Sequence, residues 1–117
     1  MEAIRAYQET KRAFADPKDG ERAVFERVTA QLREAAQLQS RTEAFHQALL
    51  ANRRLWAAVV ADVGHPNNRL SQATKESLIS LGLWVQQEST AAASGKSDLS
   101  ALIDVNEAII GGLRKQG

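Results

Sequence analysis

Residues 51–64 read ANRRLWAAVVADVG, and this stretch decides the fold because it lies within a long apolar stripe at helical spacing. Apolar and amide side chains recur every three or four residues, at Phe45, Leu49, Asn52, Trp56, Val59 and Val63. That spacing places them on one face of a helix. Ser40 and Glu43 match a capping box at its start, and Gly64 followed by Pro66 predicts its end.

A helix is predicted before this one. Asp16 suits the cap position and Pro17 the first turn. Its apolar stripe comprises Val24, Phe25, Val28, Leu32, Ala35 and Leu38.

Two further helices are predicted after it. Ser71 is expected to cap the first of them, and Gly95 to end it. Its expected inward stripe comprises Leu78, Leu81, Trp84, Val85 and Glu88. Ser97 or Asp98 is expected to cap the last helix. That helix carries Leu99, Leu102, Ile103, Asn106, Ile109, Ile110 and Leu113.

The predicted fold class is therefore all-α: a small antiparallel-type helical bundle of four main helices plus an amino-terminal helix or arm. Only two prolines and seven glycines interrupt a helix-favouring composition, and one domain is expected over residues 1–117. Tyr7 and Phe14 lie on a segment with too little apolar surface for a robust helix. Residues 1–15 are thus expected either to dock on the bundle or to form a mobile arm awaiting a partner.

The composition excludes several classes of function. Fifteen basic residues against fourteen acidic ones give a net charge of +1, which provides no long-range field to attract RNA or DNA. The chain has no cysteine, so thiol catalysis and cysteine metal sites are ruled out. The charged first residues do not resemble an export signal, and the longest apolar run is too short to cross a membrane. We expect a cytoplasmic protein.

No catalytic or cofactor-binding pattern is present. His46 and His65 have no carboxylate at metal-ligand spacing and are expected to be surface or capping histidines. The glycines near the carboxyl terminus do not follow a strand, so they predict no phosphate loop. The sequence indicates no enzyme, no metal and no cofactor.

Two asparagines on apolar stripes are unusual. Asn52 lies between Leu49 and Trp56, and Asn106 lies on the stripe of the last helix. An unpartnered buried amide costs about 1–3 kcal/mol. We expect Asn52 and Asn106 to bond each other or the backbone and so fix the register of the bundle. Alternatively, one of them faces a groove and bonds a partner.

The sequence also predicts where the two tryptophans and the arginine pair lie. Trp56 and Trp84 are both expected in the core, each indole N–H bonded to an amide or a carbonyl. Arg53 and Arg54 flank the stripe and cannot both join it. They either lie over Trp56 or the next helix, or they meet acidic groups of a partner at the rim of an apolar groove.

With these residues laid out, the chain resembles the FlaF family of alphaproteobacterial flagellar biosynthesis regulators. The resemblance runs nearly end to end and rests on the order and spacing of several motifs. They are AYQ at 6–8 with Arg12, FERVT at 25–29, NRRLW at 52–56 with Asp62, PNNRL at 66–70, ISLGLWV at 79–85 and LIDVNEAIIGGL at 102–113.

The resemblance implies a non-enzymatic protein that promotes flagellin synthesis and secretion and acts alongside the FlbT-type regulator, which restrains flagellin translation. The favoured interpretation is a chaperone that binds flagellin before export, with Tyr7, Phe14, Arg53 and Arg54 as candidate contacts. One alternative is post-transcriptional regulation, with the FlbT-type regulator or on flagellin messenger RNA. Direct RNA binding, through Arg5, Lys11 and Arg12 or through Arg53 and Arg54, is disfavoured by the near-neutral charge. A second alternative is a scaffold that pairs with another regulator or with itself.

Overall fold

The structure is a computed structural model that describes residues 18–38 and 40–116, with side chains described for 22–38 and 40–111. Its elements are four helices: α2 (Lys18–Ala36), α3 (Glu43–Val63), α4 (Gln72–Ala93) and α5 (Ser100–Gln116). The described part of the chain contains no strand, so the all-α bundle predicted from the sequence is confirmed.

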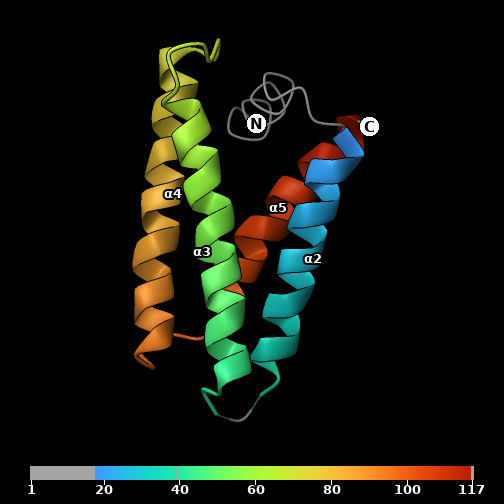
Figure 1. The fold of residues 1–117 in the computed structure, drawn as a ribbon, viewed down its shortest axis with the longest axis vertical. Coiled ribbons are helices and arrows are strands. Elements are labelled where there is room, and N and C mark those ends of the chain that lie inside the picture. Colours follow the sequence, from blue (N-terminus) through green and yellow to red (C-terminus); the bar gives the residue numbers. More distant parts are fainter. Residues whose placement is uncertain (1–17, 39, 117) are drawn as a thin grey trace.

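The helices form an uneven bundle with α3 at its centre (Figure 1). α3 packs against α4 on one side and against α2 on the other, while α5 packs chiefly against α2. α5 crosses behind the gap between α2 and α3, and its contact with α4 is slight. α4 is therefore attached to the bundle mainly through α3.

α3 begins one residue after a threonine, and this corrects the predicted capping box. Thr42 is the cap, in extended conformation, and its Oγ1 accepts from the backbone N–H of Phe45 at 3.3 Å. Ser40 lies outside the helix and is exposed. Phe45 is the third residue of the helix, and its backbone N–H, which has no partner within the helix, is satisfied by the cap side chain. The end of the helix at Gly64 is as predicted.

The ends of α4 agree with the sequence. Ser71 caps the helix and accepts from the N–H of Thr74 at 3.2 Å. At the other end Gly95 has a φ of +83°, and Lys96 N–H donates to the carbonyl of Ala91 at 2.9 Å. This is the Schellman arrangement, in which glycine adopts the left-handed conformation that closes a helix.

The start of α5 is held by one of its two candidate residues. Oδ1 of Asp98 accepts from the N–H of Ser100 at 2.9 Å and from its hydroxyl at 2.6 Å. These two hydrogen bonds stabilise the carboxylate and lower the pKa of Asp98. Ser97 makes no corresponding bond among the described residues.

The core lies along α3 and omits several residues of the predicted stripes, among them Val24 and Ile103, which are half-buried. Leu38 follows the end of α2 and is 42% exposed. Leu81, Trp84 and Glu88 are only half-buried. The inward face of α4 instead comprises Thr74, Leu78, Gly82, Val85, Ser89 and Ala92.

The shift on α4 has a steric cause. A Cβ atom on residue 82 would overlap Cγ2 of Val60 on α3. Glycine therefore allows the two helices to approach closely, and the side of α4 with small residues faces inward. The larger Leu81 and Trp84 are displaced to the flank.

Replacing Gly82 by alanine is expected to lower the free energy of unfolding by about 1–3 kcal/mol, because Val60 is β-branched and has few alternative rotamers. A Cβ added to Gly111, in α5, would meet nothing within 4 Å, so Gly111→Ala should stabilise by about 0.5–1 kcal/mol through helix propensity alone. Urea denaturation followed by circular dichroism measures both. Equal stabilisation by the two substitutions would contradict the close approach at Gly82.

Candidate functional site

The two stripe asparagines and Trp56 form one buried cluster. The indole N–H of Trp56 donates to Oδ1 of Asn106 at 2.9 Å, and Nδ2 of Asn106 donates to Oδ1 of Asn52 at 2.8 Å. All three side chains are 0% exposed. Phe25 of α2 meets the Trp56 ring edge-on at 5.8 Å between ring centroids. The pairing is the first of the two arrangements expected from the sequence, so these side chains bond within the fold.

This cluster connects helices whose backbones lie apart. Among the described residues, no Cα atom of α3 lies within 8 Å of one of α5, so Trp56 and Asn106 connect the two helices through their side chains. The bonds are in a low-dielectric interior, where they are strong and costly to lose. Nδ2 of Asn52 has no hydrogen-bond partner in the described part of the chain.

Arg53 lies between α3 and α4 and links the two helices by hydrogen bonds. Its guanidinium donates to Oε1 of Gln86 at 3.2 Å and to Oγ1 of Thr90 at 2.7 Å, both on α4. Nε2 of Gln86 donates back to the carbonyl of Arg53 at 3.1 Å. Of the alternatives left open by the sequence, Arg53 thus lies over the next helix, where it joins α3 to α4.

Arg54 is placed differently, because it is exposed at the rim of a groove between α3 and α4. We call this feature the α3–α4 groove; its volume is about 500 Å³. It is lined by Arg53, Arg54, Ala57, Val60, Ala61, Gly82, Leu83 and Gln86. Ala57 and Ala61 are small and leave the space, and no acidic side chain is among the described residues that line it.

Exposed leucines extend the apolar surface of the α3–α4 groove. Leu83 lines it and is 59% exposed. Leu50 is 38% exposed and precedes Arg54 by one turn, on the same face of α3 as Ala57. Large exposed leucines next to an arginine are typical of protein–protein contact surfaces. The sequence analysis did not identify Leu83 as a candidate binding residue. The position of Leu83 next to Gly82 was the one feature of the sequence that could have indicated it.

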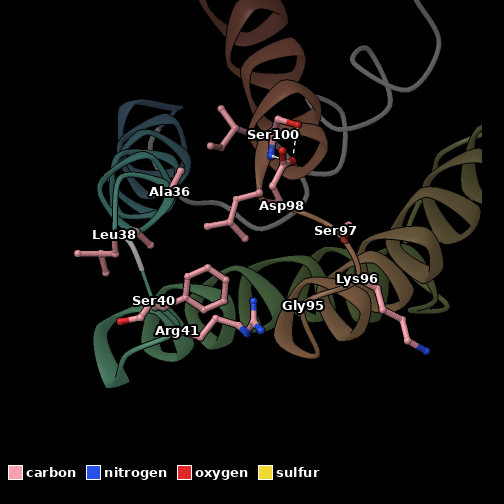
Figure 2. A pocket seen from close by; sticks show the side chains of 13 residues that line it. Ala36, Leu38, Ser40, Arg41, Gly95, Lys96, Ser97, Asp98 and Ser100 are labelled. Carbon is pink, nitrogen blue, oxygen red and sulfur yellow. Dashed lines mark hydrogen bonds between the residues drawn. The ribbon is translucent and has the colours of Figure 1, made fainter.

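A second hollow of about 540 Å³ lies at the end of the bundle, between the α2–α3 turn and the α4–α5 loop. Figure 2 shows the Arg41 side chain extending towards Gly95, with Asp98 bonded to Ser100 above it. The guanidinium of Arg41 occupies the space that a Cβ on Gly95 would need. The Arg41 guanidinium and the Asp98 carboxylate make this hollow polar, so the α3–α4 groove, with its largely apolar lining, is the better candidate for binding a partner.

The other candidate residues lie outside the described residues, at the edge of the core or at the surface. Tyr7 and Phe14, with the rest of the amino-terminal arm, lie outside the described residues. Trp84 is half-buried on α4, which corrects its expected core position. His46 is exposed and stacks edge-on against Phe45. His65 is exposed as well, and its Nδ1 accepts from the N–H of Asn67 at 3.1 Å.

The turn after α3 is built around Asn68. Its Nδ2 donates to the carbonyl of Asp62 at 3.2 Å, and its Oδ1 accepts from the N–H of Leu70 at 3.0 Å. Partial burial raises the pKa of Asp62, against smaller lowering effects of the His65 charge and the Asn68 hydrogen bond. Among described residues, no three His, Cys, Asp or Glu side chains gather as a metal site. None of the described helices combines the length and the apolar character needed to span a membrane.

Comparison with known proteins identifies one family. A family model described as flagellar protein FlaF matches residues 3–113, nearly the whole chain. No curated protein and no solved structure matches the chain. The resemblance inferred from the motifs is thereby confirmed.

Asn106→Ala is expected to lower the free energy of unfolding by about 2–4 kcal/mol, because it leaves the Trp56 N–H and the Asn52 Oδ1 buried without partners. Asn67→Ala, at an exposed loop position, is the matched control and should change stability by less than about 0.5 kcal/mol. Equilibrium urea unfolding distinguishes the two. A cost for Asn106→Ala no larger than the control's would show that the cluster does not hold α5.

Proposed function

Because the chain belongs to the FlaF family of flagellar proteins, we propose that it binds flagellin as a chaperone in the cytoplasm and so promotes flagellin synthesis and secretion. The observation that carries the proposal is the α3–α4 groove, with Leu83 exposed inside it and Arg54 at its rim. The protein acts by binding, without catalysis or a cofactor.

The α3–α4 groove suits one amphipathic helix. Flagellin's terminal segments form amphipathic helices in the assembled filament and tend to associate before then. Such a helix lays its apolar face in a hydrophobic groove and is anchored by side chains at helical spacing. Ala57 and Ala61 provide room for that face, Leu83 provides apolar contact, and Arg54 can pair with a carboxylate of the bound helix.

The α3–α4 groove is also held in shape before any partner arrives. Arg53, in its lining, is bonded to Gln86 and Thr90 of α4, and Gly82 lets α3 and α4 pack closely. A preorganised surface loses less entropy on binding than a mobile one. This supports recognition by a formed groove on the α3–α4 pair.

The RNA alternative is weakened by the same geometry. Of the arginine pair that would contact phosphates, Arg53 is already bonded to α4. Arg5, Lys11 and Arg12 lie outside the described residues. Binding through phosphate contacts would weaken steeply with salt, whereas a largely apolar groove predicts a shallow salt dependence.

Leu83→Ser and Arg54→Glu are each expected to weaken binding of monomeric flagellin by about tenfold or more, equivalent to about 1.4 kcal/mol. Isothermal titration calorimetry with monomeric flagellin measures the change, and flagellin trimmed at either terminus identifies the segment bound. The matched control is Arg27→Glu, an exposed charge reversal on α2, which should bind as the unaltered protein does.

Two results would contradict the proposal. Absence of binding to any form of flagellin at high micromolar concentration would remove the chaperone function and leave the FlbT-type regulator as the partner to test. Undiminished binding by both the Leu83 and the Arg54 variants would place the flagellin site elsewhere. Circular dichroism should show that both variants keep their helix content, since both positions are exposed.

A further inference from the structure

The other flank of α4 carries a third hollow, which is separate from the α3–α4 groove and is shallow because all its lining residues lie on α4. It has a volume of about 610 Å³, and we call it the α4 trough. It is lined by Ala73, Glu76, Ser77, Ser80, Leu81 and Trp84. Ala73, Ser77 and Ser80 are exposed, so the described helices leave this flank uncovered. α5 contacts α4 only slightly and lies towards α2 (Figure 1).

The lining of the α4 trough combines apolar bulk with space. Leu81 and Trp84 are half-buried and pack against the edge of the core. Ala73, Ser77 and Ser80 are exposed and small, so they leave a shallow floor beside the indole ring. Tryptophan at the centre of a contact surface is a frequent source of binding energy.

The charge of the α4 trough is negative. Glu76 lines it, and Glu88 lies about three turns further along α4, about 18 Å along the helix axis and one turn beyond Trp84. No ion pair joins either carboxylate to a basic side chain of a described residue. Glu76 accepts a hydrogen bond of 3.3 Å from Gln72 on its own helix. No basic side chain is among the described lining residues.

We propose that the α4 trough binds an amphipathic helix of a second protein whose polar face is basic. The apolar face of that helix packs on Leu81 and Trp84, and its lysines or arginines pair with Glu76 and Glu88. The α3–α4 groove has the opposite charge, because Arg53 and Arg54 line it. The two flanks of α4 thus select different partners, and this proposal is independent of flagellin binding.

A second copy of this chain fits the α4 trough less well. The α3–α4 groove carries arginine beside an exposed leucine. However, Arg53 is already bonded to Gln86 and Thr90, so the groove of a second copy would offer Arg54 alone to the two glutamates, whereas a basic helix can pair with both. The charge pattern therefore points to a separate helical partner.

Tryptophan fluorescence can test the proposal, because the chain contains only two tryptophans. Trp56 is 0% exposed, so a fluorescence change on binding reports Trp84. The probe is a tryptophan-free designed peptide of about 18 residues, or about 27 Å of helix, with leucine on one face and lysine on the other. A matched peptide carries glutamate in place of lysine. We expect the lysine peptide to shift Trp84 emission at micromolar concentration and the glutamate peptide to leave it unchanged.

Substitutions test whether the lysine peptide binds at the α4 trough. The double variant Glu76→Lys, Glu88→Lys should weaken the lysine peptide at least about tenfold, and Ser80→Arg should do the same by filling the trough at an exposed position. Arg54→Glu should leave this affinity unchanged. The control pair Glu34→Lys, Asp104→Lys makes the same charge change at exposed sites on α2 and α5, and it should have little effect.

The proposal is overturned by three outcomes. The first is no emission change with the lysine peptide, and the second is equal weakening by the control pair, which would indicate general charge attraction. The third is self-association of the protein, seen by light scattering and abolished by Glu76→Lys, which would make a second copy the occupant. Flagellin binding is measured separately and is expected to be the same in the double variant as in the unaltered protein.

Discussion

The bundle depends on the hydrogen bonds that run from Trp56 through Asn106 to Asn52. They connect α3 to α5 where the two backbones do not approach one another, so the long side chains determine how α5 is seated. Phe25 packs edge-on against the same indole and brings α2 to this point as well. An apolar pair could fill the same space, but hydrogen bonds accept one register and penalise others, since a slipped α5 would leave a buried N–H without an acceptor.

With one face of α3 committed to this cluster, its other faces become available for binding. Arg53 and Gly82 join α3 to α4 by opposite means, one through hydrogen bonds and the other through the absence of a side chain. Their combined effect is a close helix pair with a hollow above it, where Arg54 and Leu83 are exposed. NRRLW, at residues 52–56, therefore contains a core amide, an interhelical arginine, a rim arginine and the central tryptophan within five positions. α4 has little support from α5 and exposes both flanks, which carry opposite charges.

The sequence predicted those features that depend on local spacing. The all-α class, the ends of α3 and α4 at Gly64 and Gly95, the Ser71 cap and the shared stripe of Asn52 and Trp56 all follow from periodicity and turn chemistry. It failed on α4, because the inward face there is decided by how closely Val60 approaches Gly82, a tertiary contact that no hydrophobic pattern reveals. For the same reason the sequence showed the arginine pair but could not separate the structural Arg53 from the exposed Arg54. The α3–α4 groove could not be predicted because its lining comes from two helices, with Ala57 and Ala61 on α3 and Leu83 on α4.

The central claim is that the α3–α4 groove receives a helix of flagellin, and amide chemical shifts test it most directly. Isotope-labelled protein would be titrated with peptides that correspond to each flagellin terminus, and the perturbed amides would be mapped on the helices. The account predicts that one peptide perturbs Arg54, Ala57, Ala61 and Leu83, while Ser77 and Ser80 on the other flank of α4 stay unchanged. Perturbations confined to the end of the bundle around Arg41 and Asp98, or to the α4 trough, would contradict it.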